Sequence, residues 1–190
     1  MPTALKKGLL DSTFSPYMLH SFASTGYLPP GVHDCSLESL AAIVCFNEHR
    51  RKLWAQLANF LLWPSFSNDF AYAYIGGGYV SIKPIPRDVD LVLETELPYG
   101  PESFSAIAPF FVTGLDQIED LFGVHLHFWM ENAPTGFRDF RTFFQYQRPR
   151  SLQNFDPARG IVRLDLRDPR ILSDLRRYVK NESIDSGCKF

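Results

Sequence analysis

The sequence Ile75-Gly-Gly-Gly-Tyr79, followed after a short loop by Asp88-Val-Asp-Leu91, decides how this chain folds. Residues 70–75 are rich in strand-forming side chains, and residues 88–94 combine aliphatic side chains with acids at their start, as a strand does. Glycine adopts backbone conformations closed to other residues, and main-chain N–H groups in such a turn can bind phosphate oxygens. The stretch therefore predicts two strands joined by a glycine-rich turn that a ligand can approach closely.

The acids of this stretch point to a cation. Asp88 and Asp90 stand at positions i and i+2 of the predicted strand, so both carboxylates are expected on one face and Val89 and Leu91 in the core. Like charges held close together are costly unless a cation lies between them. Mg²⁺ suits this role because it takes a few carboxylates, water and phosphate oxygens. Alone, a triple glycine is usually a tight turn and an Asp-x-Asp pair is usually solvated, but their order and spacing together favour a site.

Outward from this stretch, hydrophobic periodicity and helix-capping residues predict further helices and strands. We expect helices over residues 36–44, 47–62, 103–121, 137–146 and 168–180, and strands over residues 124–130 and 160–166. Pro64 is expected to end the second helix. The order predicts an α+β fold, a small mixed, mostly antiparallel sheet flanked by helices. We expect an extended, irregular segment over residues 1–36, a single domain over 37–180 and a frayed tail over 181–190.

Composition excludes several classes of protein. The chain has 190 residues, 45% of them hydrophobic, and a formal net charge of −2, which argues against disorder and against nucleic-acid binding through bulk positive charge. No apolar run approaches the roughly 20 residues of a membrane-spanning helix, and the N-terminus lacks the apolar stretch of a signal peptide. Three cysteines at no metal-binding spacing indicate reduced thiols. We expect a cytoplasmic protein without a membrane partner. Aromatic residues are unusually frequent, at 15%.

A strand ending in Gly-Gly, about ten residues, and then hydrophobic-Asp-hydrophobic-Asp resembles the signature of the polymerase-beta-like nucleotidyltransferase superfamily. More narrowly, the chain resembles a family of small bacterial nucleotidyltransferase-like proteins of unknown function. The matching segments cover most of residues 28–166: 28–33, 47–51, 74–90, 143–145 and 160–166. The resemblance implies that the domain is a minimal nucleotidyltransferase fold.

The resemblance also implies a site and a reaction. It makes ATP or another nucleoside triphosphate the substrate, bound through Mg²⁺ or Mn²⁺, with Asp88 and Asp90 as metal ligands. It places Gly76, Gly77 and Gly78 at the triphosphate, and Lys83 (with Arg87) is a candidate electrostatic helper there. A hydroxyl of a protein, a tRNA or a small molecule would attack the α-phosphorus and release pyrophosphate. Positioning and charge neutralisation are most of what such a transfer needs.

Two departures from that pattern leave the activity open. Gly78 stands where a serine is usual, although its main-chain N–H remains. The next strand, 124–130, carries His125 and His127 on one face, where active members place a third carboxylate. Histidine does not replace a carboxylate for Mg²⁺, but it can act as a base or bind a softer metal such as Zn²⁺ or Mn²⁺. Asp165, on the last predicted strand, is the alternative third acid, or else the partner of a neighbouring arginine.

Two interpretations therefore remain. The chain is a nucleotidyltransferase with Asp88, Asp90, His125 and Asp165 as candidate catalytic residues. Alternatively, it is a catalytically degenerate relative that binds a nucleotide or a partner protein. Small bacterial members of the superfamily often belong to toxin–antitoxin or phage-defence pairs, so the resemblance makes a partner protein a reasonable expectation.

Overall fold

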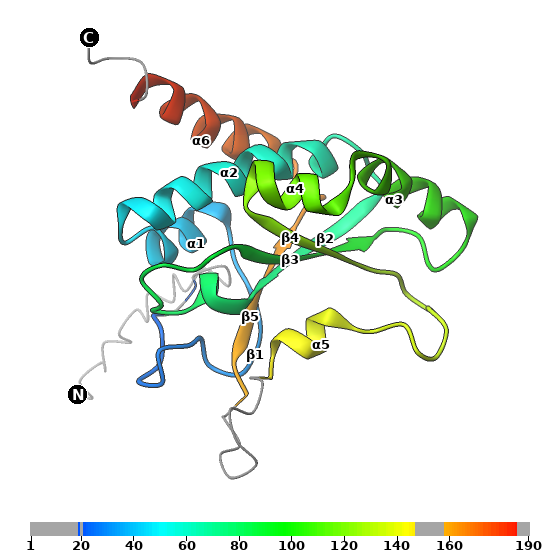
Figure 1. Ribbon diagram of the computed structural model, residues 1–190, viewed down its shortest axis with the longest axis horizontal. Helices are drawn as coiled ribbons and strands as arrows, with labels where there is room; N and C mark the ends of the chain where they lie inside the picture. The colour runs from blue at the N-terminus through cyan, green and yellow to red at the C-terminus, as the bar shows by residue number, and fades with distance from the viewer. Residues whose placement is uncertain (1–18, 20, 147–157, 186–190) are drawn as a thin grey trace, which may run out of the picture.

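The computed structural model describes residues 19, 21–146 and 158–185, which form one mixed sheet with helices on both faces (Figure 1). The strands lie in the order β1-β5-β2-β3-β4. Their bounds are β1 Gly31–Asp34, β2 Phe70–Gly76, β3 Val89–Thr95, β4 Val124–Trp129 and β5 Gly160–Asp165. The central pairings of β2 with β5 and with β3 are antiparallel, whereas β1 and β4 join the edges in parallel. The expected α+β fold with a mixed sheet is confirmed.

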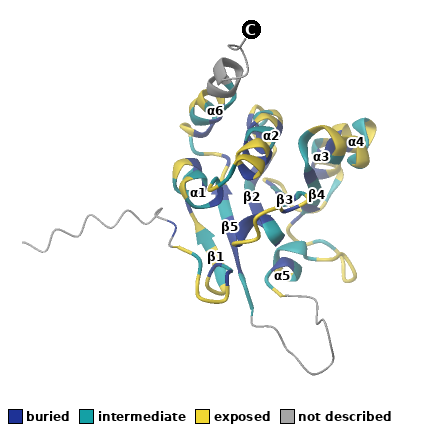
Figure 2. Cartoon of the chain, turned by 60° about the vertical axis from the view of Figure 1, so that its left-hand side comes forward, coloured by how far each residue is buried: buried dark blue, intermediate teal, exposed yellow. Residues whose placement is uncertain are grey.

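The helices are divided unequally between the two faces of the sheet. They are α1 Leu37–Val44, α2 Glu48–Ser65, α3 Pro101–Thr113, α4 Leu115–Phe122, α5 Phe140–Phe144 and α6 Ile171–Asp185. Helices α1, α2, α4 and α6 lie on one face, and the short α5 lies on the other (Figures 1 and 2). Strands β2, β3 and β5 are largely buried between them. A site on the α5 face is therefore covered by one short helix.

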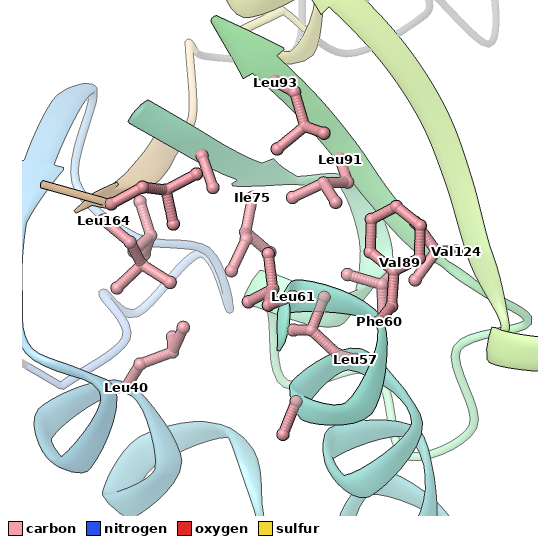
Figure 3. Packing of buried hydrophobic residues seen from close by; sticks show 14 of the residues in the cluster. Leu40, Leu57, Phe60, Leu61, Ile75, Val89, Leu91, Leu93, Val124 and Leu164 are labelled. Atoms are coloured by element: carbon pink, nitrogen blue, oxygen red, sulfur yellow. The ribbon is translucent and has the colours of Figure 1, made fainter. Parts of the chain in front are cut away.

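The main core lies between the sheet and α2. Leu57 and Leu61 of α2 point toward Ile75, Val89 and Leu91 of the sheet, and all five side chains are buried (Figure 3). A second, smaller cluster lies under α5 and contains Tyr74, Val92, Phe144 and Ile161. Strand alternation places Asp90 on the same face as Val92. The sequence thus places Val89, Leu91 and Leu93 of β3 in the main core, and Asp90 with Val92 on the α5 face.

The aromatic excess has a packing role on the helical side. Phe110 of α3 is buried and contacts the rings of four neighbours: Phe60, Trp63, Phe70 and Phe128. Large rings bury much area per residue, and pairs in tilted or edge-to-face geometry add a further contribution of roughly 0.5–1.5 kcal/mol each. Few, short helices can therefore cover a five-stranded sheet.

Two helix predictions were wrong in detail. Pro64 lies inside α2, which ends one residue later at Ser65; a proline in the final turn removes one backbone hydrogen bond and then stops further growth. Residues 103–121 form two helices, because Gly114 has φ +95° and separates α3 from α4. Pro109, in contrast, is accommodated within α3.

The predicted boundaries also need correction. Within the expected irregular segment 1–36, residues 31–34 form β1 and pair with β5, so the sheet begins before residue 37. At the other end, helix α6 continues to Asp185 because each further residue of a formed helix adds a hydrogen bond at little cost. Residues 1–18, 20, 147–157 and 186–190, which include about half of that segment and the end of the expected tail, lie outside the described residues. No helix in the described part is long and apolar enough to cross a membrane.

Candidate active site

The pairing of β2 with β3 brings the glycine turn against an aspartate. Gly76 lies opposite Asp90 in the antiparallel register. Gly77, which begins a 3₁₀ turn over Gly77–Val80, has φ +68°, and a Cβ atom built on it would lie 1.7 Å from Oδ2 of Asp90. Any side chain at this position would displace the carboxylate. Gly77 is therefore required both by the backbone conformation and by the close approach of Asp90.

The other two glycines have different roles. A Cβ on Gly76 would lie 2.8 Å from Cβ of Phe144, so this glycine lets α5 pack closely on β2. Gly78 is half-buried, and a Cβ there would meet the side chain of Lys83 at 3.3 Å. The four residues expected to bind a nucleotide thus lie together, but Gly78 and Lys83 form the more accessible part of the turn.

Helix α2 holds the loop that connects the turn to β3. Arg50, fully buried, donates hydrogen bonds to the main-chain carbonyls of Val44, Lys83 and Tyr79. Its guanidinium lies over the ring of Tyr79, 4.8 Å from the centroid. Near it, Nδ2 of Asn47 donates to the carbonyl of Pro84 at 2.8 Å, and Nε2 of His49 lies 2.7 Å from that of Pro86.

Sequence reasoning missed the role of Arg50, although a signal was present. Arg50 stands at i−3 from Leu53 and i−7 from Leu57, so it lies on the apolar face of the helix. A charged residue on that face needs polar partners, and here main-chain carbonyls of a distant loop supply them. The loop position is therefore set by an arginine that contacts no carboxylate among the described residues.

The two motif aspartates have different surroundings. Asp88 precedes β3, and its carboxylate lies 2.5 Å from Nη2 of the exposed Arg87. Asp90 lies within β3, and Nδ1 of His125 on the neighbouring strand lies 3.3 Å from its Oδ1. Burial, and then the charge of Asp88, raise the pKa of Asp90. Asp90, and not Asp88, therefore lies beside the histidine of the neighbouring strand β4.

His127 follows His125 on the α5 face of β4. Its ring stacks on Phe140 at a centroid distance of 3.7 Å, and its Nε2 is buried without a hydrogen-bond partner. Burial, together with the charge of His125, lowers its pKa to about 4. The imidazole is therefore neutral at pH 7 and available as a ligand.

Helix α5 is held over these histidines by a polar network. Asp139 caps the helix by accepting hydrogen bonds from the main-chain N–H groups of Arg141 and Thr142. Arg141 reaches Glu94 of β3, with Nη1 to Oε2 at 2.8 Å, and its guanidinium lies 4.1 Å from the ring centroid of Trp129. The ring of Phe140 is thereby kept against His127.

The structure does not bring Asp165 to this group. Tyr72 pairs with Glu94 on one side and with Asp165 on the other, so Asp165 is level with Glu94. That position is four residues along the strand direction from Asp90, or about 13 Å. Asp165 instead forms an ion pair with Arg167 at 3.0 Å.

One carboxylate and two imidazoles are the ligands that the structure gathers. Ligand atoms of Asp90, His125 and His127 all lie within 4.8 Å of one another, and Asp88 is not part of the group. Mg²⁺ prefers oxygen ligands in near-octahedral geometry. This donor set therefore does not fit Mg²⁺, whereas imidazole with carboxylate suits a transition metal.

An apolar cavity of about 840 Å³ adjoins the group between α3, β4 and the segment before α5. His127 and Phe140 form part of its wall, and Phe111, Phe128 and Phe137 also line it. Such a lining accommodates an aromatic or aliphatic portion of a ligand next to the polar group.

The lowered pKa of His127 predicts a pH dependence of stability in metal-free protein. Between pH 6.5 and about 4, the unfolded chain protonates His127 and the folded chain does not. The stabilisation is complete above pH 6.5 and is lost as the pH falls toward 4. We expect a loss of about 1 kcal/mol, reduced by solvent screening of this partly exposed ring.

Urea denaturation in chelator at several pH values measures this loss. We expect His127→Phe to remove it and His33→Ala, on β1, to retain it. Parallel pH profiles for His127→Phe and the parent protein would contradict the assignment.

Residues 20–165 match the model of a family of unknown function, DUF6932, over well more than half of the chain. Comparisons with curated proteins and with solved structures found no match.

Proposed function

We propose that this chain, which belongs to the family of unknown function DUF6932, binds a nucleoside triphosphate at the Gly77–Val80 turn and transfers its nucleoside monophosphate to a hydroxyl. The observation that carries the proposal is the close approach of Gly77 to Asp90, since it joins a glycine turn with main-chain donors to a half-buried carboxylate. Family membership itself names no reaction.

The side chains around the turn suit such a transfer. The main chain of Gly78 and the ammonium of Lys83 lie side by side and supply the donors and positive charge that a triphosphate needs. The apolar cavity beside His127 offers rings on which a nucleobase can stack. These groups position the α-phosphorus near Asp90 and His125.

His125 is the group that can take the proton of the acceptor. Its ring is 44% exposed and one nitrogen faces Asp90 at 3.3 Å, so the carboxylate orients the imidazole. The acceptor oxygen forms a bond to the α-phosphorus, the bond to the β-phosphate bridging oxygen breaks, and pyrophosphate leaves. The hydroxyl proton passes to the free nitrogen of His125.

A transfer assay tests this function. Purified protein is incubated with α-labelled ATP, GTP, CTP or UTP, with Mg²⁺, Mn²⁺ or Zn²⁺, and with bacterial extract as the source of protein, tRNA and small-molecule acceptors. We expect label on one class of acceptor and a loss of at least about 100-fold in Asp90→Asn. The control Asp69→Asn, an exposed aspartate before β2, retains activity. Equal labelling by Asp90→Asn, or none by the parent protein, contradicts transfer.

A second candidate function is binding without turnover. The ion pair of Asp88 with Arg87 and the histidine opposite Asp90 favour it, because both reduce the negative charge available to a catalytic cation. Calorimetry with a non-hydrolysable ATP analogue distinguishes the two functions. Saturable binding, weakened by Asp90→Asn, with no labelled product would support a nucleotide-binding module.

A further inference from the structure

The register of β3 with β4 brings three metal-binding side chains to one face of the sheet. Asp90 lies directly opposite His125 in the parallel pairing, and His127 is two residues further along the same strand. Residues at i and i+2 of a strand project to the same side, so both imidazoles face α5. The rings of the two histidines are 4.4 Å apart.

We propose that Asp90, His125 and His127 form a transition-metal site that binds a dication of the Zn²⁺ type, with an open coordination position. This inference rests on the proposed function only for the role of the cation in nucleotide transfer; with the cation bound, His125 is a ligand and the proton of the acceptor passes to solvent instead of to the imidazole. Binding of the metal itself is measurable without any nucleotide.

The distances suit tetrahedral coordination. Zn²⁺ bonds of about 2.0–2.1 Å to nitrogen and oxygen place neighbouring ligand atoms about 3.3 Å apart. Oδ1 of Asp90 and Nδ1 of His125 are 3.3 Å apart. The third ligand atom, from His127, lies within 4.8 Å of both, a separation that small shifts of the Asp90 and His125 side chains can close.

A simple hydrogen bond between Asp90 and His125 does not explain the surroundings of His127. Its Nε2 is buried and has no partner, although a buried polar atom left unpaired is unfavourable. Stacking on Phe140 fixes the plane of the ring. A cation would satisfy the nitrogen that the protein leaves without a partner.

The fourth position is accessible to a ligand. The side chain of His125 is 44% exposed and that of Asp90 is 18% exposed, so solvent reaches the group from the side of His125. Three protein ligands with an open position are the pattern of catalytic rather than structural zinc sites. Gly77 lies against Asp90 on the other side, so a phosphate oxygen bound at the turn would lie next to the metal.

Selectivity follows from the ligands. Two imidazoles and one carboxylate favour Zn²⁺ and Co²⁺ over Mn²⁺, and all three over Mg²⁺. Histidine stands where the resemblance expects a third carboxylate. This difference then changes which metal the site prefers and does not abolish the site.

Metal titration of chelator-treated full-length protein tests the proposal. Calorimetry with Zn²⁺, Mn²⁺ and Mg²⁺ is expected to show one Zn²⁺ per chain, bound at least about 100-fold more tightly than Mg²⁺. Co²⁺ should give the intense visible absorption of a tetrahedral site, and Zn²⁺ should displace it. Absence of stoichiometric Zn²⁺ binding, or equal affinity for Mg²⁺, would overturn the proposal.

Variants assign the binding to these residues. We expect His125→Ala and His127→Phe each to weaken Zn²⁺ binding by at least about tenfold, and His33→Ala to leave it unchanged. Phenylalanine at 127 retains the stack on Phe140, and thermal unfolding in chelator shows whether each variant is folded. Unchanged Zn²⁺ binding in both folded variants would place the metal elsewhere on the chain.

The outcomes separate this inference from the proposed function. Zn²⁺ binding at the three residues without any labelled product would confirm the metal site and contradict transfer. Transfer supported by Mg²⁺, together with the absence of stoichiometric Zn²⁺ binding, would support transfer and overturn the metal site.

Discussion

Replacing Arg50 with methionine is expected to lower the free energy of unfolding by about 3–5 kcal/mol. The guanidinium donates to carbonyls of Val44, Tyr79 and Lys83 and is fully buried. Methionine fills much of the volume but leaves these acceptors without donors. Urea denaturation at pH 7 measures the effect as a lower midpoint with an unchanged slope.

Arg51 provides the matched control for Arg50. It is the next residue of α2 and is exposed, so Arg51→Met removes the same charge from the same helix and is expected to change stability by less than about 0.5 kcal/mol. If the two variants unfold at the same urea concentration, the hydrogen bonds of Arg50 do not hold the loop. Because this loop leads into Asp88 and Asp90, the Arg50 variant should also bind Zn²⁺ and nucleotide more weakly while still folded.

Replacing Gly77 with alanine is expected to weaken Zn²⁺ and nucleotide binding by more than about tenfold and to destabilise the fold by about 1–3 kcal/mol. The Cβ would lie 1.7 Å from Oδ2 of Asp90, and φ is +68°. Either the carboxylate or the turn must move, and the proposed site uses both. Calorimetry with Zn²⁺ and with the ATP analogue measures the first effect, and urea denaturation the second.

Gly31→Ala separates backbone strain from the clash. Gly31 has φ +119° and nothing within 4 Å of an added Cβ, so its alanine variant is strained but displaces no side chain. We expect it to lose stability and to retain ligand binding. A Gly77→Ala protein that binds Zn²⁺ as tightly as Gly31→Ala would show that Asp90 is not held by this contact.

Four of the five strands and most of the helices could be predicted from local pattern, whereas β1 lies in a segment expected to be irregular. Val89, Leu91 and Leu93 occupy alternate positions of β3, and the core they predict is present. The interruption at Gly114 was missed because a glycine within an apolar periodic segment is compatible both with one long helix and with two short ones. Choosing between them depends on the tertiary position of the following helix.

The candidate site was only partly predictable. The face shared by His125 and His127 follows from strand alternation alone, and so does the face of Asp90. That His125 lies opposite Asp90 and that Asp165 is displaced by about 13 Å along the strands depend on register. Register is set by long-range pairing of β4 with β3 and of β5 with β2, which no local segment specifies.

The amino-acid sequence by itself determined the α+β class, the glycine turn and the aspartates that follow it, because backbone freedom and alternation are properties of adjacent residues. The tertiary structure decided which of these residues meet. It placed a carboxylate oxygen of Asp90 within 4.8 Å of ligand atoms of two histidines, formed an ion pair between Asp88 and Arg87, and buried Arg50 beneath the loop. These outcomes depend on distances between residues far apart in the chain, and such distances exist only after the sheet and its covering helices have packed.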